Sequence, residues 1–137
     1  MTANYSTQFR SIKNEVSPEE WETRLNLAAC YRLTDVYGMT DLIYNHITVR
    51  VPDTASGAER HFLINPFGLN YDEVTASNLV KIDLDGNVLQ DSGTGYGINQ
   101  AGFVIHSAVH RARQDVGCVI HTHSPAGMAI SALECGL

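Results

Sequence analysis

The feature that most constrains the fold is a short apolar strand that leads directly into a helix start. Cys118 to Ile120 is apolar, and His121 to His123 follows it. Ser124 and Pro125 then provide a capping hydroxyl and a proline at the first helical position. In α/β folds, ligands commonly bind where the carboxyl end of a strand opens on a helix N-terminus. The junction therefore predicts an α/β domain with a candidate site around these histidines.

The remaining patterns predict one domain over residues 17–137, preceded by a flexible arm at 1–16. The expected elements are helix 17–37, strands 45–51 and 62–64, a short helix 75–79, strands 80–84 and 87–89, helix 100–113, strand 118–123 and a final helix from 124 toward 135. The apolar stripe expected on the first helix is Trp21, Leu25, Ala28 and Ala29, widened by Leu27, Tyr31 and Val36. Strand 45–51 alternates apolar and polar residues, which predicts that one of its faces is buried.

Composition and charge exclude several classes of protein. The 137 residues carry 9 Lys and Arg against 15 Asp and Glu, a net charge of −6, which argues against a surface for nucleic acid or anionic membranes. No apolar run reaches the roughly 20 residues that span a bilayer. The three cysteines form no CxxC motif, which indicates free thiols in a reducing compartment, and Cys118 is expected in the core. These features predict a cytoplasmic protein.

His121 and His123 are candidate metal ligands. Residues i and i+2 of a strand project from the same face, about 6.6–6.8 Å apart. Two imidazoles at that spacing can converge on one divalent ion, of which zinc is the most typical for this donor type. The alternative is a pair of incidental histidines, one buried and one exposed. Zinc usually takes three or four protein donors, so these two residues alone do not complete a site.

Other histidines and a glycine-rich loop leave alternatives open. His106 and His110 are four residues apart on the expected helix 100–113, which suits a shared ligand, but the pattern favours packing for His106 and solvent exposure for His110. His46 either lines a polar pocket or is an ordinary surface residue. The loop 91–97, with three glycines before a helix, either cradles an anion or connects two elements.

Taken together, several segments resemble the class II aldolase/adducin family. They are Tyr44–Arg50, Leu63–Gly68, Val80–Gly86, His106–Arg113 and Val119–Pro125, and the resemblance covers about residues 18–135. It implies a three-layer α/β/α sandwich of the class II aldolase type, truncated here because its C-terminal part is missing. It also implies a small sugar or hydroxy-carbonyl substrate and a homo-oligomer, often a fourfold-symmetric tetramer with the active site at a subunit interface.

The same resemblance assigns roles to individual residues. His121 and His123 match two of the family's three zinc-binding histidines, and the third is expected beyond Leu137. The family's catalytic glutamate falls on Gly102, so the group that moves a proton is unknown; the candidates nearby are Tyr96, Asn99 and Gln100. The positions that match substrate-binding residues of the family are His46, Thr48, Gly68 and Gln100.

These features favour a zinc-dependent aldolase-like lyase that cleaves a carbon–carbon bond in a small hydroxy-carbonyl compound. Two alternatives remain open. The region around Gly102 looks closer to the adducin-like branch, which implies a non-catalytic binding module associated with actin or the cytoskeleton. The chain is also consistent with an inactive fragment.

Overall fold

The computed structural model describes residues 10–52, 60–91 and 93–135. Residues 1–9 of the arm predicted at 1–16, and residues 53–59 of the polar turn that follows the first strand, lie outside the described residues. Ile12, at the start of the described chain, is already buried in the core. Among the described residues, no helix has the length and apolar character needed to cross a membrane.

The observed elements follow the predicted order. They are α1 (Pro18–Val36), β1 (His46–Arg50), β2 (His61–Ile64), the 3₁₀ turn η1 (Tyr71–Glu73), β3 (Val80–Asp83), β4 (Val88–Gln90), α2 (Gln100–Ala112), β5 (Cys118–His121) and α3 (Pro125–Ser131). The prediction of a short helix at 75–79 is wrong. There Thr75 and Asn78 each accept a hydrogen bond from the other's backbone N–H, at 2.8 and 3.2 Å, and this side-chain pairing replaces helical bonds with a turn.

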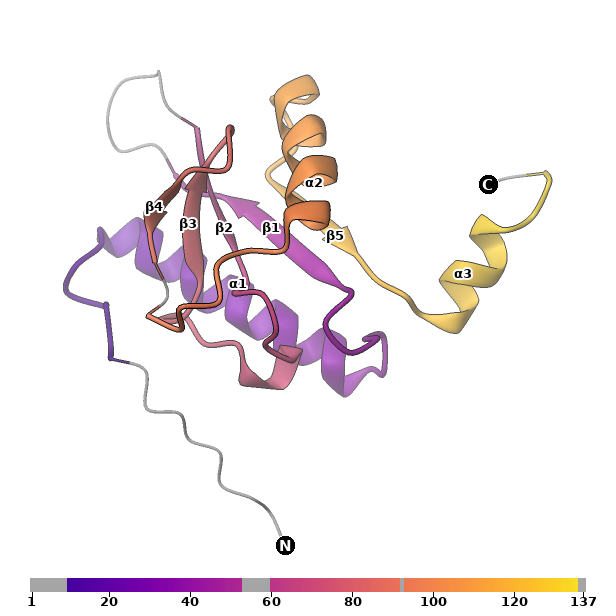
Figure 1. The fold of residues 1–137 in the computed structure, drawn as a ribbon, viewed down its shortest axis with the longest axis horizontal. Coiled ribbons are helices and arrows are strands. Elements are labelled where there is room, and N and C mark those ends of the chain that lie inside the picture. The colour runs from indigo at the N-terminus through magenta and orange to yellow at the C-terminus, as the bar shows by residue number, and fades with distance from the viewer. Residues whose placement is uncertain (1–9, 53–59, 92, 136–137) are drawn as a thin grey trace, which may run out of the picture.

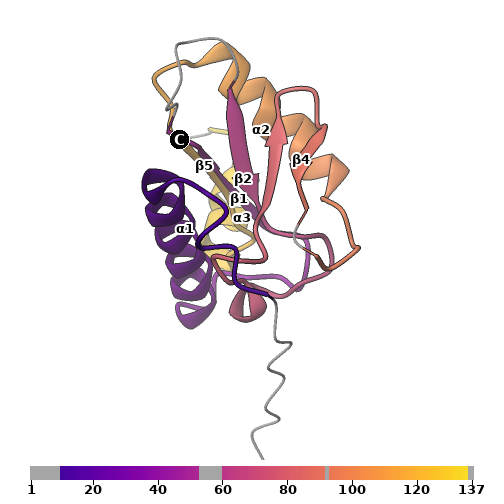
Figure 2. The ribbon, with the colours of Figure 1, turned by 90° about the vertical axis from the view of Figure 1, so that its left-hand side faces the viewer.

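The strands form one antiparallel sheet in the order β4-β3-β2-β1-β5. Helix α1 lies on one face of this sheet and α2 on the other (Figure 2), which confirms the three-layer α/β/α arrangement. Helix α3 extends away from the sheet beyond β5 (Figure 1), and none of its residues is buried. The junction singled out in the sequence therefore lies at one edge of the sheet.

Each face of the sheet carries its own apolar cluster. The cluster shared with α1 contains Leu27, Tyr31, Ile47, Val51, Leu63, Tyr71, Val74 and Leu79. The cluster on the α2 side contains Phe62, Ile64, Val80, Ile82 and Ile98. Both faces of β1 are consequently buried, and the prediction that only one would be is wrong. The polar residues His46 and Thr48 lie on the face toward α2, where alternation alone suggested solvent.

The buried face of α1 agrees with the predicted stripe at Leu27, Ala28 and Tyr31 but differs from it elsewhere. Leu25 is 49% exposed and Ala29 is exposed, whereas Arg24 is fully buried. The Arg24 guanidinium donates to Glu20 at 2.9 Å and to the carbonyl oxygen of Leu79 at 2.9 Å. Burial lowers the pKa of Arg24, and Glu20 opposes that shift. A pattern of apolar residues does not predict that Arg24 lies on this face, because Arg24 is buried there as part of an ion pair with Glu20.

Cys118 is exposed, contrary to the core position predicted for it. It lies on the edge strand β5, where it lines an open hollow together with Cys30 and residues of α1 and β1. An apolar strand at a sheet edge has fewer neighbours than a central one, and the sequence pattern does not distinguish the two positions.

Replacing Arg24 with methionine tests the buried ion pair. We expect Arg24→Met to lower the free energy of unfolding by about 3–5 kcal/mol, because Glu20 would lose a buried partner and the Leu79 carbonyl would lose its donor. Urea unfolding followed by circular dichroism measures the change. The matched control is Arg113→Met, which removes only an exposed pair with Asp115. An equal effect of the two substitutions would contradict the central role of Arg24.

Candidate functional site

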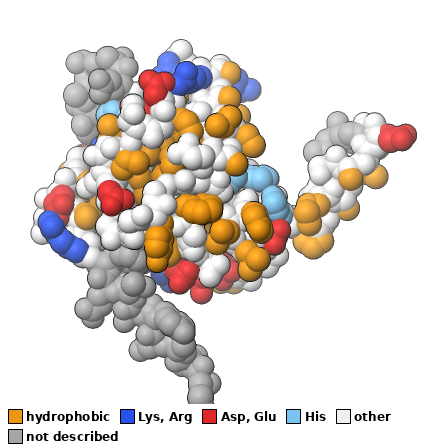
Figure 3. All heavy atoms as spheres, viewed as in Figure 1, with side chains coloured by type: hydrophobic (Ala, Val, Ile, Leu, Met, Phe, Trp, Pro, Cys, Tyr) orange, Lys and Arg blue, Asp and Glu red, His pale blue; other side chains and the backbone are white. Residues whose placement is uncertain are grey.

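Five of the six histidines form one continuous row between α2 and the end of β5. In order, the row is His110, His106, His46, His121 and His123. Neighbouring ring centroids are 4.5 Å apart for His46 and His106, 4.7 Å for His46 and His121, and 4.8 Å for His121 and His123. The space-filling view shows histidine side chains gathered at the surface where the chain leads to α3 (Figure 3). One end of the row is therefore open to solvent.

The register of the sheet brings His46 to the predicted metal ligands. Strands β1 and β5 are antiparallel, and His46 is the direct partner of His121 in that pairing. Directly paired residues project from the same face of a sheet, so the two rings meet edge to face. The two residues are 75 positions apart in the chain, and their spacing in the sequence gives no sign of the contact.

His121 and His123 can act as a pair of metal donors. Strand β5 ends at His121, two residues earlier than predicted, yet the two rings still approach each other. Imidazoles that share a tetrahedral zinc, with bonds of about 2.0–2.1 Å, have ring centres roughly 5 Å apart, which the observed separation matches. The described residues contain no group of three His, Cys, Asp or Glu side chains that could hold a metal ion.

Buried ring nitrogens without hydrogen-bond partners occur along the whole row in the described part of the chain, at Nε2 of His106 and Nδ1 of His110 as well as beside the outer pair. His46 is only 3% exposed, and within the described part of the chain neither of its ring nitrogens has a hydrogen-bond partner. Nδ1 of His121 is likewise buried and has no hydrogen-bond partner among the described residues. Burial and the neighbouring His121 and His123 lower the pKa of His46 to about 4, and burial lowers the pKa of His121 as well. Both rings are neutral at pH 7, the form that binds metals.

Gly102 leaves the space that His46 occupies. It lies in the first turn of α2, where its N–H donates to the capping side chain of Asn99 at 3.1 Å. A Cβ atom added at Gly102 would lie 2.6 Å from the Cδ2 atom of His46, much closer than atoms can approach without movement. Position 102 cannot carry a side chain while the His46 ring keeps this place.

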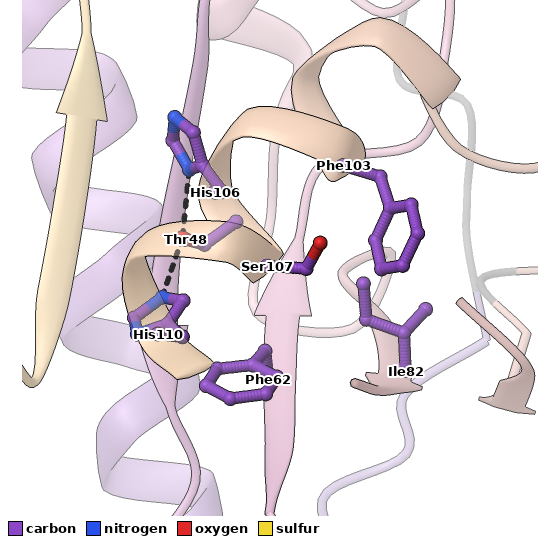
Figure 4. A pocket seen from close by; sticks show the side chains of 7 residues that line it. All are labelled: Thr48, Phe62, Ile82, Phe103, His106, Ser107 and His110. Atoms are coloured by element: carbon purple, nitrogen blue, oxygen red, sulfur yellow. Dashed lines mark hydrogen bonds between the residues drawn. The ribbon is translucent and has the colours of Figure 1, made fainter. Parts of the chain in front are cut away.

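At the inner end of the row, the Thr48 hydroxyl joins two buried histidines by hydrogen bonds (Figure 4). The Thr48 hydroxyl lies 2.7 Å from Nδ1 of His106 and 2.9 Å from Nε2 of His110. A hydroxyl has one proton, so it donates to one ring and accepts from the other, which couples the tautomers of the two histidines. His110 is 1% exposed and stacks on Phe62, so the prediction of a solvated His110 is wrong. The packing alternative holds for His106, which is 2% exposed.

The remaining candidate residues lie around α2 and the loops before it. The side-chain oxygen of Asn99, one of the candidates near Gly102, caps α2. Gln100 is exposed at the first position of α2, and Tyr96 is 60% exposed in the glycine-rich loop. Gly68 has a φ of +85° in the turn after β2, a conformation that favours glycine. Among the described residues, no hydrogen bond or ring contact joins Asn99, Gln100, Tyr96 or Gly68 to the histidine row.

Sequence reasoning missed Asp41, which contacts the row from the loop between α1 and β1. Its Oδ2 lies 3.1 Å from Nδ1 of His123. No motif marks this aspartate, because the contact joins residues 82 positions apart. Only the packing of the loop against the end of β5 reveals it.

Comparisons with known proteins agree with this architecture. The model of the Class II Aldolase and Adducin N-terminal domain matches residues 25–137. Alpha-adducin of Mus musculus is 55% identical over 114 residues, which are 83% of this chain and 15% of that protein. The structure of an aldolase II superfamily protein from Pseudomonas syringae is 55% identical with a TM-score of 0.86, covering 93% of this chain and 50% of that one.

A third comparison is with an enzyme of named substrate. The L-fuculose 1-phosphate aldolase of Glaciozyma antarctica PI12 is 36% identical with a TM-score of 0.75, over 83% of this chain and 45% of the enzyme. The chain spans about half the length of the bacterial relatives it matches, and less of the adducins.

The buried histidines predict that stability falls as the pH drops below about 6.5. Burial lowers the pKa of His106 to about 3 and that of His110 to about 4, from 6.5 in the unfolded chain. At a pH between the folded and the unfolded pKa, the unfolded state binds more protons than the folded state. The contribution of each neutral, buried histidine to stability is therefore complete above pH 6.5 and is lost as the pH falls. We expect a loss of about 1 kcal/mol or more per histidine between pH 7 and pH 5, measured by urea unfolding. His110→Phe should flatten the dependence, and an unchanged slope would contradict this account.

A double-mutant cycle tests the packing of Gly102 against His46. We expect Gly102→Ala to lower the free energy of unfolding by about 1 kcal/mol, because overpacking outweighs the better helix propensity of alanine. With His46→Ala already present, the same change should stabilise the protein by up to about 1 kcal/mol, since the obstructing ring is gone. Thermal or urea unfolding of the four proteins gives both values. The same sign in both backgrounds would show that the ring does not occupy this space.

Proposed function

Because the chain belongs to the class II aldolase and adducin family, we propose that it forms part of a zinc-dependent aldolase-like lyase. The reaction is cleavage of a carbon–carbon bond in a small sugar or hydroxy-carbonyl substrate. The observation that carries the proposal is the adjacency of the His121 and His123 rings at the open end of the histidine row. The named activity of the Glaciozyma antarctica relative supports the substrate class.

His121 and His123 would hold the metal. A zinc ion, or another divalent metal, would supply Lewis-acid polarisation of a substrate carbonyl and its neighbouring hydroxyl. Each would bind the metal through a ring nitrogen that carries no proton. We expect the remaining protein donor from outside residues 1–137, as the family resemblance implies.

The group that moves a proton differs from the family's carboxylate. Gly102 has no side chain, and the His46 ring takes the space there, so His46 is the polar residue that faces the metal-binding histidines from β1. Of the three candidates nearby, Asn99 is engaged as a helix cap and Gln100 carries no titratable proton. Tyr96 is therefore the residue we propose for proton transfer. His46, Gly68 and Gln100 remain proposed substrate contacts.

Thr48 takes a different role in this proposal. Both of its hydrogen bonds go to buried histidines, so its hydroxyl orients His106 and His110 and supports the substrate site from within. The resemblance to the family further suggests a cytoplasmic homo-oligomer, a tetramer with active sites between subunits.

A non-catalytic binding module is the second candidate. The 55% identity to alpha-adducin and the glycine at the position of the family's catalytic glutamate favour it. In that case the sheet and helices would present a surface for association with the cytoskeleton. The two candidates share the metal-binding pair but differ in turnover.

Metal content and activity of the protein at its full natural length test the proposal. We expect about one zinc per chain by elemental analysis, lost in His121→Ala because one of two adjacent donors is removed. The control is His61→Ala, a histidine on β2 opposite Asp83. Cleavage is then measured on a panel of ketoses, with and without phosphate, and Tyr96→Phe should lower kcat about 100-fold.

Each outcome separates the candidates. Protein that binds no divalent metal would overturn the zinc-dependent lyase. Zinc bound by His121 without turnover on any member of the panel would favour the binding module.

A further inference from the structure

We propose that Asp41 is a positioning residue that holds His123 in the tautomer able to bind a metal through Nε2. The tautomer itself is a property of this chain. Its consequence for metal affinity rests on the proposed function.

The argument begins with the protons of the contact. The Asp41 carboxylate can only accept hydrogen bonds when ionised, and its Oδ2 lies 3.1 Å from Nδ1 of His123. The hydrogen of a neutral His123 ring must therefore be on Nδ1, which leaves the lone pair on Nε2. Metal-binding histidines commonly donate their second N–H to a carboxylate in this way. His121 differs, because within the described residues its Nδ1 has no partner.

The loop that carries Asp41 is fixed by interactions of its own. The Asp41 backbone N–H donates to the side-chain oxygen of Asn45, a residue only 1% exposed. The Asp41 carbonyl oxygen accepts from the N–H of Tyr44 at 3.0 Å, which closes a tight turn. Two hydrogen bonds thus fix the backbone from which the Asp41 side chain reaches His123.

Leu42 shows what this turn requires. Its φ is +46°, the only positive φ at a non-glycine position among the described residues. A bulky residue stays in this left-handed conformation only when its surroundings impose it. The strain is adjacent to Asp41, and it places a carboxylate against the ring that ends the histidine row.

An ordinary surface ion pair does not account for these features. The side chains of Asp41 and His123 are 48% and 27% exposed, so burial does not force them together. Exposed pairs on flexible side chains form without a fixed backbone and contribute little. Here the backbone is locked by a buried asparagine, which indicates a geometry that serves His123.

Nitrogen-15 NMR of the metal-free protein measures the tautomer directly. We expect His123 to carry its proton on Nδ1 in the wild type, and Asp41→Ala to shift the population toward the Nε2–H form. His121 gives an internal control because its signals should not change. Asp41→Asn, which keeps the size of the side chain and one acceptor oxygen, should give an intermediate population.

Two further variants separate positioning from folding. Leu42→Gly relieves the strain but keeps Asp41, so its His123 tautomer should match the wild type. Asp85→Asn removes an exposed carboxylate that pairs with Arg111 elsewhere, and it should also leave His123 unchanged. An unaltered His123 tautomer in Asp41→Ala would overturn the proposal.

Zinc affinity, measured by chelator competition in the protein at its full natural length, tests the consequence. Asp41→Ala should weaken binding roughly 10–100-fold, as loss of a carboxylate partner of a metal-binding histidine typically does. Equal affinity in wild type and Asp41→Ala would overturn this step. Wild-type protein that binds no zinc would overturn the proposed function instead, and the tautomer measurement would then decide the role of Asp41 alone.

Discussion

The antiparallel pairing of β1 with β5 is the constraint on which the rest of the site depends. It sets His46 opposite His121, and it directs His46 and Thr48 toward α2. A shift of one residue would turn both side chains to the α1 face and place Ile47 among the histidines. The apolar cluster around Ile47 and Tyr31 opposes such a shift, since Ile47 is fully buried there and its N–H donates to the Tyr31 hydroxyl at 3.0 Å. The α1-side core thus specifies the geometry of a polar site on the opposite face.

The sequence predicts the element order and the adjacency of His121 and His123 because both depend on local signals. Ser17 and Ser124 do cap helices, and His121 and His123 do lie side by side. What it cannot predict depends on contacts between distant segments. His110 follows the pattern of a solvated helix residue, yet it is buried because Thr48 and Phe62 meet it from β1 and β2. Asp41 carries no signal at all, since its role arises from a turn that reaches the end of β5.

At position 102, the lack of a side chain on α2 leaves space that the His46 ring of β1 occupies. The family resemblance predicts a glutamate at this position, where this chain has glycine. In this chain the glycine and His46 form a complementary pair, in which the absence of one side chain makes room for the other. The polar group in this space is the His46 imidazole of β1, whose pKa burial lowers to about 4 and whose ring contacts His121. A carboxylate could not be introduced by substitution at position 102 alone, because the His46 ring would have to move first.

The two ends of the histidine row therefore have different physical roles. At the inner end, the Thr48 hydroxyl is hydrogen-bonded to both His106 and His110. This group stabilises the packing of α2 on the sheet. At the outer end, His121 and His123 keep solvent access, and a locked turn supplies an oriented carboxylate. His46 joins the two, with neither of its nitrogens partnered in the described part of the chain. Unsatisfied buried nitrogens are costly. In the described part of the chain they lie along the whole row, since Nε2 of His106 and Nδ1 of His110 lack partners as well, and the metal proposed for the outer end accounts only for those beside His121.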